Sequence, residues 1–217
     1  MLHYLPGCDV KKNHNDAINK IIRYMESKGA IIDQCCRVKK KLLNENDIMI
    51  NNCTLCELVL SETHQENECK SLYEFVLQDE SFPWSDHHRD KITIQDCWRT
   101  RDNLKLQNAI RECLIKMNFE IIELEENYNQ TKFDGVWLYN NPAQNCLETA
   151  PITFKNIQDN YVMLLDEEEQ IKKMQDWCKK YETDKVLVYC NGCERGIKIG
   201  GGKPVHIVEL IAENLNG

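Results

Sequence analysis

Five cysteines in the first third of the chain follow short apolar segments that are typical of strands. They are a single cysteine, an adjacent pair and a Cys-Xaa-Xaa-Cys motif: Cys8, Cys35, Cys36, Cys53 and Cys56. Residues that follow parallel strands meet at one edge of the sheet, so we expect these thiols to converge. Thiolates gathered in this way bind soft metals or iron–sulfur clusters, or take part in redox chemistry.

A second, weaker set of cysteines repeats this order in the rest of the chain. Cys97 follows an apolar segment at 92–96, and Cys190 and Cys193 form another Cys-Xaa-Xaa-Cys motif after a segment at 185–189. Three thiols leave a four-ligand site incomplete, and the candidates for the fourth ligand are a further cysteine, Asp96, Asp134 and His206. A metal site, a thiol redox pair and a relic of duplication all remain open for this set.

The four remaining cysteines have no partner at a useful spacing: Cys69, Cys113, Cys146 and Cys178. Cys113 and Cys178 lie within helical patterns, where we expect them to be core or surface residues.

The elements that position these cysteines alternate between short apolar strands and amphipathic helices. The clearest helical patterns cover 14–29, 54–65, 103–117 and 166–181, and Gly29 stands where a glycine cap would end the first of them. Such an alternation predicts an α/β fold with parallel sheets.

The order of elements is the same in both halves, which indicates a tandem repeat of two pseudo-symmetric small parallel-sheet units. We expect a first repeat at 1–85, a linker at 82–90 and a second repeat at 90–217. The second repeat differs in two respects, because Phe133-Asp134-Gly135 stands where the first has its cysteine pair and because 140–154 is an insertion.

Composition narrows the classes of function. The chain has 217 residues, 12 cysteines and a net charge of −8, and that negative charge disfavours nucleic acids and anionic membranes as partners. We see no N-terminal signal and no apolar run that could span a bilayer, so we expect a cytoplasmic protein without membrane insertion. Excess cysteine in that reducing compartment points to metal binding or catalysis rather than to disulfides.

The cysteine order resembles the cysteine-rich CCG-domain family, which includes the CCG-domain component of heterodisulfide reductase. Each family copy has a lone cysteine, a Cys-Cys-Gly and a Cys-Xaa-Xaa-Cys. The first repeat resembles that pattern except that Arg37 replaces the glycine, and the second is degenerate. The resemblance covers nearly the whole chain as two copies.

This resemblance implies an iron–sulfur redox function. It implies that a cluster, [4Fe-4S] in type, is bound by Cys8, Cys35, Cys36, Cys53 and Cys56, and that electron transfer or disulfide and thiol reduction takes place there. Since the chain lacks a flavin-binding or ferredoxin-like segment, a redox partner that carries such a group would have to deliver electrons. The alternatives are a zinc-stabilised or metal-free interaction module that has lost the redox chemistry, and a thiol-based sensor without metal.

Overall fold

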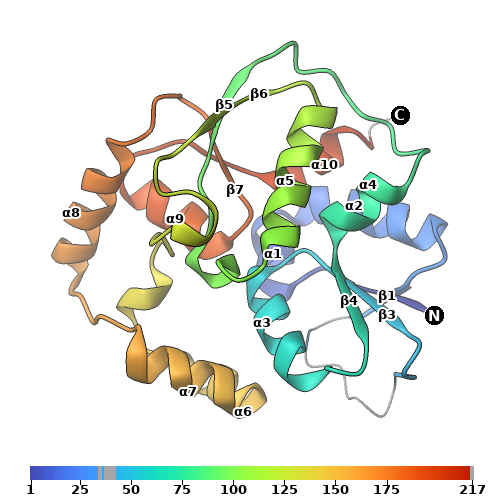
Figure 1. The fold of residues 1–217 in the computed structure, drawn as a ribbon, viewed down its shortest axis with the longest axis horizontal. Coiled ribbons are helices and arrows are strands. Elements are labelled where there is room, and N and C mark those ends of the chain that lie inside the picture. The colour runs from blue at the N-terminus through green and yellow to red at the C-terminus, as the bar shows by residue number, and fades with distance from the viewer. Residues whose placement is uncertain (34–35, 37–42, 216–217) are drawn as a thin grey trace. The chain divides into compact units, whose positions relative to one another are not determined.

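The computed structural model describes residues 1–33, 36 and 43–215 (Figure 1). Contacts divide the chain into two units, each of which contains one four-stranded sheet with all strands parallel. The predicted α/β class, with two equivalent parallel-sheet units, is therefore confirmed. No helix in the described part of the chain is long and apolar enough to cross a membrane.

The first unit consists of 1–83, 143–155 and 208–217. Its sheet has the order β2-β1-β3-β4. The strands are β1 (Leu2–Leu5), β2 (Ile31–Ile32), β3 (Ile48–Asn51) and β4 (Glu68–Ser71). The helices of the N-terminal segment are α1 (Cys8–Asn13), α2 (Asn15–Ser27), α3 (Thr54–Thr63) and α4 (Leu72–Gln78).

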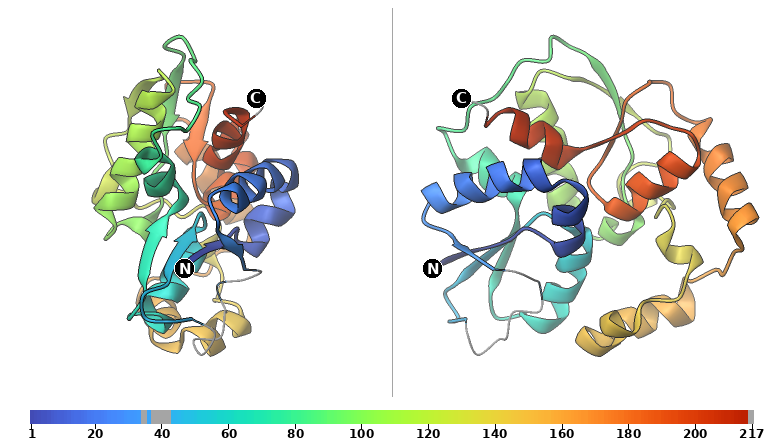
Figure 2. Two further views of the ribbon diagram at one scale, coloured as in Figure 1. Left: turned by 90° about the vertical axis from the view of Figure 1, so that its right-hand side faces the viewer. Right: turned by 180° about the vertical axis from the view of Figure 1, so that it is seen from behind.

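The second unit consists of 84–142 and 156–207, and its sheet has the equivalent order β6-β5-β7-β8. Its strands are β5 (Lys91–Ile94), β6 (Glu120–Glu123), β7 (Val186–Val188) and β8 (Pro204–His206). Its helices are α5 (Leu104–Lys116), α8 (Glu167–Cys178) and α9 (Asn191–Ile199), and the short 3₁₀ turns are η2 (Trp98–Thr100), η3 (Tyr128–Gln130) and η4 (Trp137–Tyr139). Figure 2 shows these elements from two further directions.

Two segments of the sequence-defined second repeat make their contacts within the first unit. One is 143–155, which holds α6 (Gln144–Thr149) and the start of α7 (Pro151–Asn160). The other is 208–217, which holds most of α10 (Ile207–Glu213). The insertion that distinguishes the second repeat thus completes the structure of the first unit.

Each sheet has a topological switch point between its two central strands. In the first unit the chain leaves β1 for β2 on one side and later returns to β3 on the other side, and β5 and β7 have the same relation in the second unit. The central strands end level with each other, because Leu5 pairs with Asn51. Loops diverge at such a point, and the crevice outside the strand ends is where open α/β sheets bind ligands.

The helices pack as their apolar periodicity predicts. Ile18, Ile21 and Met25 of α2 are fully buried, and Gly29 follows that helix with a positive φ of 80°. The apolar sequence of β2 is typical of a buried strand, but Ile31 is 44% exposed. β2 lies at the edge of its sheet and has only two residues, so that it covers little of the core.

Candidate metal centres

Four potential ligands converge in the second unit. They are three cysteines and one aspartate: Cys97, Asp134, Cys190 and Cys193. One ligand atom from each lies within 4.8 Å of all the others, and none of the four residues is more than 2% exposed. Sulfur atoms about 2.3 Å from a central zinc ion, arranged as a tetrahedron, would be about 3.8 Å apart. The group therefore has the size and the donor types of a site for a single ion.

The ends of the central strands position the three thiols. Cys97 comes after β5 and forms the N-cap of η2, and Cys190 comes after β7 and forms the N-cap of α9. Cys193 lies in the first turn of α9, so its thiol faces the same crevice as that of Cys190. The order of elements in the sequence predicted that these three cysteines would lie near one another, and in the structure they do.

Asp134 reaches the site on the long loop that follows β6. The backbone N–H of Trp98 donates to the carbonyl of Phe133 over 2.8 Å, which ties this loop to the turn after Cys97. Phe133 is buried and its ring stacks on that of Trp177. Asp134 is thus held by the residues on either side of it as well as by its own side chain.

A close contact between glycines allows this loop to approach α9. Gly135 has a positive φ of 56°, and a Cβ atom at this position would lie 1.8 Å from the carbonyl oxygen of Gly192. A Cβ atom at Gly196 would lie 2.5 Å from the Cα of Gly135. The glycine of Phe133-Asp134-Gly135 is therefore required for two reasons, its backbone conformation and the space beside α9.

Arg99 supplies a buried positive charge beside the site. Its Nε donates to Asp134 Oδ2 over 3.2 Å, and its Nη2 lies 3.0 Å from Asp134 Oδ1. The guanidinium also lies over the ring of Trp137, 4.1 Å from the ring centroid. A cation in this place offsets the negative charge that thiolates and a carboxylate bring together.

The pKa values of three of the four ligands reflect their burial. Burial raises the pKa of Asp134 to about 7, although the Arg99 guanidinium lowers it. Burial also raises the pKa of Cys97 and Cys193 well above the usual thiol value, and contact with the other thiols adds to the rise in Cys193. A bound metal ion reverses this preference, because it stabilises the deprotonated form of its ligands.

The other two candidates for the fourth ligand are not in this group. Asp96 accepts hydrogen bonds from Arg111 Nη2 over 2.7 Å and from the Tyr189 hydroxyl over 2.8 Å. Its carboxylate is thereby engaged in an ion pair with a neighbouring helix. His206 is buried on β8 and does not belong to the four-ligand group either.

Five cysteines of the first unit line one small cavity. The cysteines that line it are Cys8, Cys36, Cys53, Cys56 and Cys146, and its volume is about 40 Å³. Contacts with the thiols of Cys36 and Cys53, together with burial, raise the pKa of Cys56 well above its usual value. Cys35, the other member of the predicted pair, lies outside the described residues.

The switch point of the first sheet positions these thiols. Cys8 is the first residue of α1 after β1, and Cys53 is the N-cap of α3 after β3. Gly7 has a positive φ of 74°, and a Cβ atom there would lie 2.8 Å from the Cβ of Cys53. Cys8 is exposed whereas Cys56 is only 3% exposed, so the thiols extend from the surface into the interior.

The sequence did not indicate that Cys146 lies near the other cysteines of the first unit. It lies on α6, a helix of the insertion, and it is 6% exposed. The sequence showed no partner for it because its neighbours in space are distant in the chain. The only available signal was the presence of a cysteine within an insertion that the first repeat lacks.

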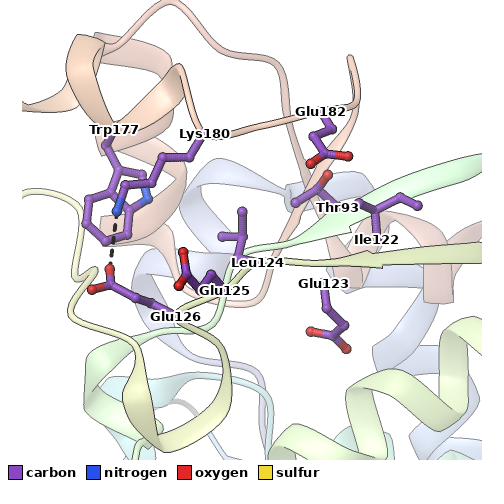
Figure 3. Close-up of a pocket in the computed structure, with 9 residues that line it drawn as sticks. All are labelled: Thr93, Ile122, Glu123, Leu124, Glu125, Glu126, Trp177, Lys180 and Glu182. Carbon is purple, nitrogen blue, oxygen red and sulfur yellow. Dashed lines mark hydrogen bonds and ion pairs between the residues drawn. The ribbon is translucent and has the colours of Figure 1, made fainter.

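A larger cavity of about 400 Å³ lies elsewhere in the second unit (Figure 3). None of the described residues that line it is a cysteine, and several of the charged side chains around it are already paired. Lys180 lies over the ring of Trp177 and forms an ion pair of 3.2 Å with Glu126. We therefore take the two thiol sites as the chemically distinctive features of the molecule.

Comparisons of the chain with protein-family models, with curated proteins and with solved structures found no match. The geometry of the two thiol sites is consequently the basis for assigning a function.

Proposed function

We propose that the protein is a cytoplasmic iron–sulfur redox protein whose first unit binds the cluster. The observation that carries this proposal is the meeting of Cys8, Cys36, Cys53 and Cys56 around one cavity at the switch point of a parallel sheet. Sulfur ligands in this number select soft metals and iron–sulfur clusters over oxygen-preferring cations. The reducing cytoplasm would keep the thiols available as ligands.

The residues of the first unit fit a cluster by the chemistry of their donors. The cysteines come from different parts of the unit, with Cys8 on α1 and with Cys53 and Cys56 at the start of α3, and all of them line one cavity. The N–H groups at the start of α3, which Cys53 caps, favour negative charge on the sulfur atoms. A bound cluster would supply one-electron transfer, and the exposed Cys8 leaves one side of the site accessible from solvent.

A redox partner is a necessary part of this proposal. The sequence contains no flavin-binding or ferredoxin-like segment, so electrons would come from a protein that carries such a group. A disulfide or thiol substrate is consistent with a site built from thiols, as in the family that the chain resembles. We propose this class of substrate without assigning a particular compound.

For the second unit we propose a structural zinc ion. Cys97, Asp134, Cys190 and Cys193 are four ligands of the types that zinc accepts, and their burial leaves no open position for a substrate. This observation also supports the alternative function, a zinc-stabilised interaction module in which neither unit performs redox chemistry.

Anaerobic purification followed by metal and sulfide analysis tests the proposal. We expect a brown protein that absorbs near 400 nm and contains iron, acid-labile sulfide and about one zinc ion per chain. The Cys56→Ser variant should lose iron and colour, and the Cys69→Ser variant should keep both, because Cys69 is not among the described residues that line the cavity. A colourless protein that binds zinc in both units would refute the redox proposal and support the alternative.

A further inference from the structure

The inserted helix α6 brings a fifth thiol to the first unit. Cys146 lines the same small cavity as Cys36, Cys53 and Cys56, and Asn145 and Thr149 of the same helix line it as well. A cysteine that only fills a hydrophobic core packs against carbon atoms. The cavity beside Cys146 has four other cysteines among its lining residues, together with the apolar Leu55 and Val59.

The segment that carries Cys146 is fixed to the helix that carries Cys56. The carboxylate of Glu62, near the end of α3, accepts hydrogen bonds from the backbone N–H groups of Ile152 over 3.1 Å and Thr153 over 2.8 Å. Burial raises the pKa of Glu62, but these hydrogen bonds outweigh it, so that the pKa lies below its ordinary value. A carboxylate at the start of α7 also complements the helix dipole.

Packing supports the same placement. Ala150 and Phe154, between α6 and the middle of α7, are fully buried. The N–H of Ala150, the C-cap of α6, donates to the carbonyl of Cys146 over 3.0 Å. The segment that carries Cys146 is therefore joined to α3 by its hydrogen bonds to Glu62, and its apolar side chains are buried.

We propose that Cys146 is a metal ligand of the first unit, supplied by the insertion in the second half of the chain. This inference rests on the proposed function of that site. Together with Cys36, Cys53 and Cys56 it provides four thiols around the cavity, which is a complete set for a tetrahedral ion or a four-iron cluster. The cavity of about 40 Å³ exceeds the roughly 10–15 Å³ that a water molecule needs, so it has room for an ion.

The test is a titration of the reduced, metal-free, full-length protein with Cd²⁺, followed by thiolate-to-cadmium charge-transfer absorbance. The wild type is compared with the Cys146→Ser, Cys56→Ser and Cys69→Ser variants. We expect Cys146→Ser and Cys56→Ser each to lower the absorbance at saturation and to weaken Cd²⁺ binding by at least about ten-fold. Cys69→Ser should match the wild type, and the contribution of the second unit is common to all four proteins.

The possible outcomes separate this inference from the function on which it rests. If Cys146→Ser behaves like Cys69→Ser while Cys56→Ser loses binding, Cys146 is not a ligand and the first-unit site stands. If Cys56→Ser also leaves binding unchanged, the first unit binds no Cd²⁺ and both proposals fail.

A second measurement on the wild type avoids the risk that Cys146→Ser does not fold. Iodoacetamide modification of each cysteine is followed by mass spectrometry with and without Cd²⁺. We expect Cd²⁺ to slow modification of Cys146 and Cys56, because a ligating thiolate is not available to the reagent, and to leave Cys69 unchanged. Equal modification rates of Cys146 in the two conditions would overturn the inference.

Discussion

The contact between Gly135 and α9 leads to a prediction with a matched control in the same unit. Gly135→Ala places a methyl group at a φ of 56° and 1.8 Å from the carbonyl oxygen of Gly192. Gly201 also has a positive φ, 83°, but a Cβ atom there would meet no atom of the described residues within 4 Å. The two alanine variants share the conformational cost, and only Gly135→Ala adds a collision.

The expected magnitudes follow from this difference. A left-handed conformation costs an alanine about 1–2 kcal/mol, which should be the whole effect of Gly201→Ala. An ordinary contact with the Gly192 oxygen requires at least about 3.4 Å, so the loop of Gly135→Ala must move by more than about 1 Å, and such overpacking adds about 1–3 kcal/mol. The same movement displaces Asp134, and we expect zinc affinity to fall by about 10–100-fold.

Tryptophan fluorescence during urea unfolding measures the stability of the second unit, because the four tryptophans of the chain all belong to it. Zinc affinity is measured by competition with a chromogenic chelator. Gly201→Ala should bind zinc like the wild type. The reasoning would be refuted if Gly135→Ala and Gly201→Ala were equally destabilised and bound zinc with equal affinity.

Three further predictions concern charge and ligands. Arg99→Met should lower zinc affinity by about 10–100-fold in the same competition assay, whereas Arg101→Met should not, because Arg99 is the one of the two that contacts the ligand carboxylate. The lowered pKa of Glu62 should stabilise the first unit at pH values above 4.5, the ordinary pKa of a glutamate, and this stability should be lost as the pH falls below that value towards the lowered pKa. Glu62→Gln should remove this pH dependence from acid unfolding curves, and an unchanged curve would contradict the prediction. Cys36→Ser should abolish the colour of anaerobic protein while Cys190→Ser keeps most of it, and equal iron loss in both variants would contradict the assignment of the cluster to the first unit.

The fold could be predicted from the sequence where apolar periodicity reports burial. The amphipathic pattern at 103–117 corresponds to α5 (Leu104–Lys116), and the central strands are short apolar runs with cysteines after them. β4 was not predicted, because it contains Glu68 and Lys70 and lies at a sheet edge, where charged residues are common. Edge strands bury too little surface to show a clear apolar pattern.

The candidate sites, like the fold, contain residues that the sequence could predict and residues that it could not. The convergence of Cys97, Cys190 and Cys193 could be predicted, since parallel strands bring their carboxyl ends to one edge. The choice of Asp134 over Asp96 could not, because it depends on which carboxylate Arg111 engages. Cys146 could not be found either, since the contact of the α6–α7 segment with Glu62 joins parts of the chain with no shared local pattern.

The path of the chain has a consequence for how its two halves fold. The chain passes from one unit to the other after residues 83, 142, 155 and 207, so neither unit is a continuous stretch of sequence. If the chain were cut at the repeat boundary, the N-terminal fragment would lack Cys146 and Glu209. The carboxylate of Glu209 forms a hydrogen bond with His14 within the first unit. The two halves of the chain are thus interdependent, and we expect neither to fold autonomously when expressed without the other.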